Sequence, residues 1–526
     1  MGWSARGDMA IQMPEAARSA AIIQRAKRSQ TSSIAPFARG MRSACTMPAI
    51  ATATSKANMT PNHTSNGLSS MNRFPALAAA AIITSAWGAP GDRNAQIVRI
   101  VGEVSPQRIE ATIRKLVSFG TRNSLSDTQS DVRGIGAARR WIKAELERCA
   151  AGTPLKVEFD SHRIESGARV PRPTDFVNVV ATLPGTQMES RDRIYVVSGH
   201  YDSMPSSPVD GEKDAPGAND DASGTAVSME LACVMSKYKF DATLVFMAVA
   251  GEEQGLLGST GYAKAAKARG LDIAGMFTND IVGNTKSADG KVDASRVRLF
   301  AEGVPPSKEP SDAVIAELRT SGENDLPTRQ LARFVKESAE RHVDGIKVDM
   351  IWRRDRYLRG GDHFPFLDAG YAALRFTEPV EDWRHQHQDV RVVDGVQFGD
   401  LPEFVDFAYV AQVARVNGAA LAALALGPSV PRDVELENLR LEMDSTLRWK
   451  ANPEPDVAGY RILWRETTSA VWQNALDAGN VTRHTITGLS KDNVIFGVQA
   501  YDRDGNLSVP AYPKPYRPPP ATAPAR

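Results

Sequence analysis

Three short apolar runs that each end in acidic residues or histidine constrain what this chain can fold into. They are VVSGHYDS, with His200 and Asp202, LVFMAVAGEE, with Glu252 and Glu253, and MFTNDIVG, with Asp280. Runs this short and this apolar are typical of strands that are buried on both faces. Because the carboxyl ends of parallel strands meet at one edge of a sheet, we expect these polar side chains to lie close together.

Segments with helical periodicity separate the apolar runs. GTAVSMELACVMSKY lies between the first and the second, and STGYAKAAKARG lies between the second and the third. This alternation predicts an α/β fold with a mostly parallel central sheet flanked by helices. We assign it to a domain over residues 89–427, in which residues 396–426 form one long helical region that covers the sheet.

The pattern changes after Gly427-Pro428-Ser429-Val430-Pro431. Short runs of alternating apolar and polar residues follow, which predicts a small all-β sandwich over residues 432–512 with Trp449 and Tyr460 in its core. The stretches LRWKANPEPDVAGYRILWR and VIFGVQAYDRDGNLS resemble a fibronectin type III module. We expect an accessory module that binds a surface, a polymer or the first domain, followed by a disordered Pro-rich tail over residues 513–526.

The N-terminal segment differs in composition from the rest of the chain. The whole chain has a net charge of +1, which gives no electrostatic case for binding nucleic acid, but the low-complexity residues 1–70 alone carry +6. Residues 71–88 have the layout of a signal peptide, with Arg73, an apolar stretch too short to span a membrane, and small residues before the expected cleavage site. We therefore predict a secreted or periplasmic protein without a stable membrane span, and interpret residues 1–70 as a mis-assigned start, with a genuine extension as the alternative.

The chain has only three cysteines: Cys45, Cys149 and Cys233. This number excludes a disulfide framework. Cys149 and Cys233 both fall on predicted helices, and we interpret them as small buried apolar residues, with a single bridge between them as the alternative.

The acidic residues and histidines have the chemistry of metal ligands. A ligating imidazole usually donates its second N–H to a carboxylate, which Asp202 could provide for His200. In GANDDASG, Asp221 or Ser223 could cap the following helix, which leaves Asp220 free to bridge two metal ions. Burying an acidic pair such as Glu252 and Glu253 at the end of a strand is costly unless the pair faces cations. One of the two could bind a metal ion while the other takes a proton from the metal-bound water.

Taken together and in this order, the residues resemble the secreted co-catalytic two-zinc aminopeptidases, the family of bacterial leucyl aminopeptidases that also includes plasma glutamate carboxypeptidase and glutaminyl cyclases. The resemblance covers about residues 105–425 and implies two Zn²⁺ ions per chain. It implies that His200 and Asp280 bind one ion, that Glu253 and His385 bind the other, and that Asp220, joined to Asp221 by a cis peptide bond, bridges them. Glu252 would be the general base, and Asp202 would support His200.

Two departures from the family pattern concern the end of the domain. The family's Ser-Asp-His-x-x-Phe appears here as Gly361-Asp362-His363-Phe364-Pro365-Phe366, with glycine in place of serine. The family's His-Thr-x-x-Asp appears as His385-Gln386-His387-Gln388-Asp389, without the threonine. We favour His385 as the last ligand because its spacing to Asp389 is that of the family, and His387 is the alternative.

The predicted function is a zinc aminopeptidase that acts on peptides, in which two zinc ions activate a water molecule and Glu252 takes its proton. Arg356, Tyr357 and Arg359 lie in a basic stretch that could bind a substrate carboxylate, with Tyr357 beside the oxyanion, or could form structural ion pairs instead. A carboxypeptidase or dipeptidase on the same scaffold is the alternative. A glutaminyl cyclase or a metal-free binding protein fits the intact ligand set less well. The sequence does not indicate an oligomeric state.

Overall fold

The computed structural model describes residues 92–306 and 309–516. The predicted low-complexity segment 1–70 and signal peptide 71–88 lie outside the described residues. The predicted disordered tail begins too early, because Lys514–Pro515 form strand β17, which pairs in parallel with β11. The rest of that tail, from residue 517, also lies outside the described residues.

An eight-stranded mixed sheet forms the centre of the first domain, in the order β1-β2-β4-β3-β5-β8-β6-β7. Its middle strands β4, β3, β5 and β8 are parallel, whereas β1 and β2 pair antiparallel at one side and β6 runs antiparallel to β8 at the other. The predicted α/β fold is thus confirmed, with a parallel centre and antiparallel flanks. The strands are β1 Lys156–Ile164, β2 Thr174–Leu183, β3 Arg193–His200, β4 Thr243–Val249, β5 Asp272–Asn279, β6 Arg296–Ala301, β7 Lys347–Ile351 and β8 Ala373–Thr377.

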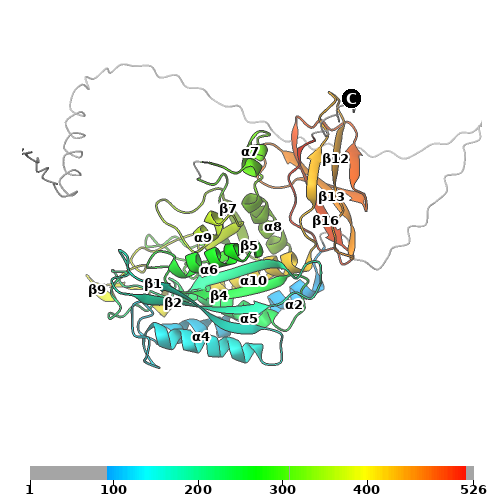
Figure 1. The fold of residues 1–526 in the computed structure, drawn as a ribbon. Helices are drawn as coiled ribbons and strands as arrows, with labels where there is room; N and C mark the ends of the chain where they lie inside the picture. The colour runs from blue at the N-terminus through cyan, green and yellow to red at the C-terminus, as the bar shows by residue number, and fades with distance from the viewer. Residues whose placement is uncertain (1–91, 307–308, 517–526) are drawn as a thin grey trace, which may run out of the picture. The chain divides into compact units, whose positions relative to one another are not determined.

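Helices cover both faces of this sheet (Figure 1). Strand β4 illustrates why: Leu244, Phe246 and Ala248 belong to one apolar core, and the intervening Val245, Met247 and Val249 belong to another. A strand whose alternate side chains are all apolar must be covered on both sides. The first core includes residues of α2 Ala95–Glu103, α3 Pro106–Val117, α4 Gly134–Ala150, α5 Ala222–Met235, α8 Pro327–His342 and α10 Phe407–Leu426, and the second includes residues of α6 Leu257–Ala268 and α9 His363–Asp368. A further helix, α7, spans Asp312–Leu318.

Helix α10 is shorter than predicted. The expected helical region from residue 396 begins instead with strand β10 (Val396–Phe398), which pairs with β9 (Arg391–Val393), and with the 3₁₀ turn η1 (Pro402–Phe404). The helix starts only after Asp406, whose carboxylate caps it by accepting a hydrogen bond from the backbone N–H of Tyr409. Its length and composition would allow it to span a membrane, but 83% of its most apolar window is buried inside the protein, as expected for a core helix.

Cys149 and Cys233 form a disulfide, with their Cα atoms 4.9 Å apart. The interpretation of both as small buried apolar residues is therefore wrong, and the alternative, a single bridge between them, is confirmed. Cys149 lies in the last turn of α4 and Cys233 near the end of α5, and the two helices pack against each other. The bridge joins positions 84 residues apart, so the sequence could not indicate that the two cysteines meet.

The C-terminal residues form two sheets around a common apolar core, in the orders β15-β12-β11-β17 and β14-β13-β16. Trp449 and Tyr460 lie in this core, as predicted. A buried ion pair joins the sandwich to the first domain: Arg465 Nη2 lies 2.7 Å from Oδ2 of Asp325. The sandwich was expected to bind a surface, a polymer or the first domain, and in the structure it contacts the first domain. The strands are β11 Arg432–Leu436, β12 Ser445–Lys450, β13 Val457–Glu466, β14 Asn474–Gly479, β15 Arg483–Ile486 and β16 Val494–Asp502.

Candidate metal centre

His200 is the last residue of β3, and its two ring nitrogens face different groups. Nδ1 lies 3.2 Å from the backbone oxygen of Asp202 and 3.5 Å from its Oδ1. Nε2 points the other way, 3.1 Å from Oδ1 of Asp220 and 4.0 Å from Oδ1 of Asp280. A histidine oriented through Nδ1 presents Nε2 to a ligand, which is the arrangement of a metal-binding imidazole.

The loop before α5 presents Asp220. Asp221 caps the helix, because its Oδ1 accepts from the N–H of Gly224 at 2.9 Å, and its Oδ2 accepts from the N–H of His200 at 2.9 Å. The peptide bond between Asp220 and Asp221 is cis, as the resemblance implied. The N–H of Asp220 donates to Oδ2 of Asp400 at 2.6 Å. Asp221 and Asp400 thus hold the loop, and the carboxylate of Asp220 is left to face the site.

Glu252 and Glu253 follow β4 and are positioned by Asp202. The two oxygens of the fully buried Asp202 carboxylate each accept one backbone N–H, from Glu252 and from Glu253, both at 3.3 Å. Oδ2 also accepts from the hydroxyl of Ser124 at 3.2 Å. Burial raises the pKa of the Glu252 carboxyl well above its usual range, and the neighbouring carboxylates of Asp280 and Glu253 add to this effect, while His200 opposes it.

His387, not His385, reaches the candidate metal centre. Nε2 of His387 lies 3.0 Å from Oδ2 of Asp220 and 3.2 Å from Oε2 of Glu253. The ring of His385 instead stacks on Phe404, with ring centroids 3.7 Å apart. The prediction of His385 is therefore corrected to His387. The prediction depended on the spacing between His385 and Asp389, but the side chain of Asp389 contacts Ser206 and Lys213 rather than the ligand groups.

The residues form two ligand groups that share one carboxylate. The first is His200, Asp220 and Asp280, and the second is Asp220, Glu253 and His387, with the ligand atoms of each group within 4.8 Å of one another. Oε1 of Glu253 is buried and makes no hydrogen bond within the described part of the chain, and Nε2 of His200, although 3.1 Å from Oδ1 of Asp220, lacks hydrogen-bond geometry to any group there. Buried polar atoms without partners are costly. Nitrogen and carboxylate donors suit Zn²⁺, so this donor set fits two divalent ions with Asp220 between them.

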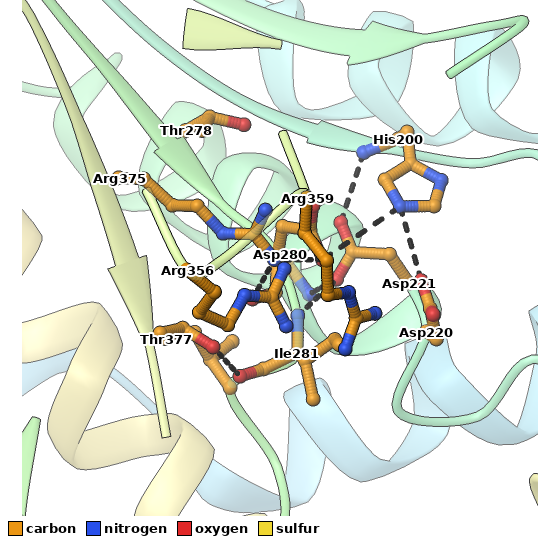
Figure 2. Close-up of polar contacts among 12 residues, drawn as sticks. His200, Asp220, Asp221, Thr278, Asp280, Ile281, Arg356, Arg359, Arg375 and Thr377 are labelled. Carbon is orange, nitrogen blue, oxygen red and sulfur yellow. Dashed lines mark hydrogen bonds and ion pairs between the residues drawn. The ribbon is translucent and has the colours of Figure 1, made fainter. Parts of the chain in front are cut away.

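A buried arginine adjoins the first group (Figure 2). Arg375 comes from β8 and has no exposed surface. Its Nη2 lies 2.8 Å from Oδ1 of Asp280, and its Nη1 lies 3.1 Å from Oδ2 of Asp355. A Cβ atom on Gly361 would approach Nη1 to 2.9 Å. Glycine at the position of the family's serine thus leaves room for the guanidinium of Arg375. Arg375 was not predicted from the sequence, because its segment AALRFT has the pattern of an apolar strand.

A cavity of about 610 Å³ opens over the two ligand groups. Arg356 and Arg359 line it, as does Arg169, which the sequence did not single out. Arg356 is held by Asp355 at 3.2 Å and by Glu381 at 3.3 Å. Tyr357 does not line the cavity: it is 82% exposed, and Arg353 lies over its ring. The predicted role of Tyr357 beside the oxyanion is therefore wrong.

A family model and sequence relatives agree with this chemistry. The family model "Peptidase family M28" matches residues 178–392. A "Probable zinc metalloprotease" from Pyrenophora teres f. teres is 46% identical over 430 residues, which are 81% of this chain and 88% of that protein. A "Probable zinc metalloprotease" from Leptosphaeria maculans is also 46% identical, over 80% of this chain and 97% of that protein. Among solved structures, an aminopeptidase from Aneurinibacillus sp. strain AM-1 matches with 16% identity and a TM-score of 0.43, over 62% of this chain and 95% of that chain.

Proposed function

Because the chain belongs to peptidase family M28, we propose that it is a zinc-dependent exopeptidase that removes residues from the N-terminus of peptides. The observation that carries this proposal is the pair of ligand groups that share Asp220 at the base of an open cavity. His200 and Asp280 would hold one Zn²⁺, Glu253 and His387 would hold the other, and Asp220 would contact both.

The protein groups around the ions have distinct roles in this proposal. Bound zinc would supply a Lewis acid for the peptide carbonyl and would make a water molecule acidic enough to lose a proton near neutral pH. Glu252, which lines the cavity beside both groups, would accept that proton and return it to the leaving amine. Asp202 would act through position alone, because it orients His200 and fixes the backbone that bears Glu252 and Glu253.

A carboxypeptidase or dipeptidase on the same scaffold is the second candidate function. It is favoured by Arg356 and Arg359, which line the cavity and could bind the C-terminal carboxylate of a substrate. A carboxypeptidase would cleave the substrate peptide from its C-terminus, whereas a dipeptidase would need both ends of the substrate to fit in the cavity.

We also propose that the protein is exported and that its C-terminal sandwich is a fibronectin type III module. The Cys149–Cys233 disulfide supports export, because such bonds persist mainly in oxidising compartments. The two sheets of residues 432–516 around one core support the module assignment.

Product analysis tests the proposed activity. The zinc-loaded chain is incubated with a five-residue peptide and with the same peptide acetylated at its N-terminus. Shortening of only the free-amine peptide, from its N-terminus, is the expected result. Shortening of both peptides from the C-terminus would move the assignment to a carboxypeptidase, and cleavage of neither, with zinc bound, would contradict both.

A further inference from the structure

Arg169 is a cation without a carboxylate partner at the edge of the cavity. It lies in the exposed turn between β1 and β2, and its Nη1 donates to the backbone oxygen of Glu253 at 3.0 Å. Within the described ranges, no carboxylate lies within ion-pair distance of its guanidinium. The backbone of a proposed metal ligand therefore anchors Arg169 at the cavity, and its charge is left unbalanced.

Arg359 is also incompletely balanced. Its Nη1 reaches Oε2 of Glu381 only at 3.4 Å, and the same carboxylate already pairs with Arg298 at 2.6 Å and with Arg356 at 3.3 Å. One carboxylate thus faces three guanidinium groups. Arg359 has 27% of its side chain exposed and makes the longest of the three ion pairs. Its other contacts are a 3.4 Å hydrogen bond to Gln386 and the ring of Trp383, so it is the one most able to turn toward a ligand.

Bound metal would leave the cavity with an excess of positive charge. The acidic residues that line it are Asp220, Glu252, Glu253 and Asp280, and two divalent ions would balance their four charges. The arginines of the lining would then set the local potential, and a positive, partly enclosed pocket attracts anionic groups. Figure 2 shows Arg356 and Arg359 beside Asp280, on the side of the first ligand group.

We propose that this cavity selects substrates that carry a carboxylate near the scissile bond, and that Arg169 and Arg359 bind it. This inference rests on the proposed function, which it narrows to a substrate class. Guanidinium groups bind carboxylates through paired, charge-assisted hydrogen bonds. The carboxylate has two sources in peptides: an acidic side chain, or the C-terminus of a peptide as short as two residues.

Matched peptide pairs test this specificity and identify the source of the carboxylate. The zinc-loaded full chain is assayed with Leu-Leu against Leu-Leu-amide, and with Glu-Leu-amide against Gln-Leu-amide. We expect kcat/KM to fall by about 10- to 100-fold when the carboxylate is neutralised in one of the two pairs. The pair in which kcat/KM falls identifies the source of the carboxylate. Equal kcat/KM within both pairs would overturn the inference without contradicting the proposed exopeptidase activity.

Variants link the preference to the two arginines. Arg169→Met and Arg359→Met should each raise KM for the favoured peptide more than they lower kcat, and should reduce the ratio of kcat/KM between that peptide and its amide or Gln partner. Arg353→Met is the matched control, because Arg353 lies over the Tyr357 ring outside the cavity. An unchanged preference in both cavity variants would overturn the assignment.

Binding without turnover separates this inference from the proposed function. Calorimetry on zinc-loaded Glu252→Gln, with the same peptide pairs, measures affinity even if the protein cleaves none of them. Tighter binding of the carboxylate partner, lost in Glu252→Gln/Arg359→Met, would support the inference in the absence of peptidase activity. Equal binding of both partners would overturn it.

Discussion

Nη2 of Arg375 lies 2.8 Å from Oδ1 of Asp280, and neither side chain is exposed beyond 6%. The other end of the same guanidinium contacts Asp355 and the backbone oxygen of Gly360. The carboxylate of a proposed metal ligand is therefore fixed by a buried cation rather than by a neutral hydrogen-bond donor. The same Oδ1 lies 4.0 Å from Nε2 of His200, within the ligand group that Asp280 forms with His200 and Asp220.

Replacing this arginine should destabilise the protein. Arg375→Met would remove the buried guanidinium that both Asp280 and Asp355 contact, and breaking a buried ion pair by removing one partner costs about 3–5 kcal/mol. Denaturant unfolding of the zinc-loaded variant measures this cost. Arg375→Lys should be more stable than Arg375→Met but less stable than the parent, because lysine keeps the positive charge but lacks the forked guanidinium that reaches two carboxylates. A variant as stable as the parent would show that Arg375 is dispensable.

Gly361 should tolerate no side chain. The added methyl group of Gly361→Ala would lie 2.9 Å from Nη1 of Arg375 and 3.3 Å from Oδ2 of Asp280, so the pinned guanidinium and the ligand must move. We expect weaker zinc binding and at least a tenfold loss of activity, as for other groups that orient metal ligands. Gly102→Ala is the matched control, because nothing lies within 4 Å of a Cβ there. Equal zinc affinity in the two variants would contradict this reading.

The two histidines of the His385–His387 loop should behave differently. His387→Ala removes a group 3.2 Å from Glu253 and should cost one zinc ion and at least about 10- to 100-fold in activity. His385→Ala removes a ring stacked on Phe404 and should retain the zinc content of the parent. Metal analysis of the two purified variants decides the matter, and the reverse pattern would restore His385 as the ligand.

The contact between the sandwich and the first domain should contribute to stability through Asp325. This buried carboxylate pairs with Arg465 at 2.7 Å and with Arg333 at 3.4 Å. Asp325→Asn would leave two buried guanidinium groups unpaired and should lower the free energy of unfolding by about 3–5 kcal/mol. The exposed pair of Arg93 and Asp344 is the control: Asp344→Asn should change nothing measurable. Equal effects at both sites would argue against a buried interface.

The contribution of Asp241 to stability should fall as the pH rises from about 4 to about 7. Burial raises the pKa of Asp241 from 3.8 to about 7, and the nearby carboxylates of Asp456, Asp502 and Asp504 raise it further. The folded protein therefore holds this proton more tightly than the unfolded chain, and the stabilisation is present below pH 3.8 and lost as the pH passes 7. Asp241→Asn should flatten this dependence in urea unfolding at pH 5 and pH 8. If the free energy of unfolding changed between pH 5 and pH 8 by the same amount in the variant as in the parent, Asp241 would not cause the pH dependence.

The convergence of His200, Glu253 and Asp280 at the strand ends could be predicted because it depends on local pattern and topology. β4, β3 and β5 are adjacent parallel strands, so residues that follow each of them meet at one edge. The choice of His387 over His385 depends on a loop whose course is set by long-range contacts, including the stacking of His385 on Phe404. Arg375 gave no signal either, because its charge is balanced by Asp280 and Asp355 from distant segments.

Zinc content of the parent chain and of Asp220→Asn tests the central claim, that two ions share Asp220. We predict about two zinc ions per parent chain and loss of both in Asp220→Asn, whereas His387→Ala should keep one. A parent chain with a single zinc ion, or an Asp220→Asn variant that keeps two, would contradict the shared centre.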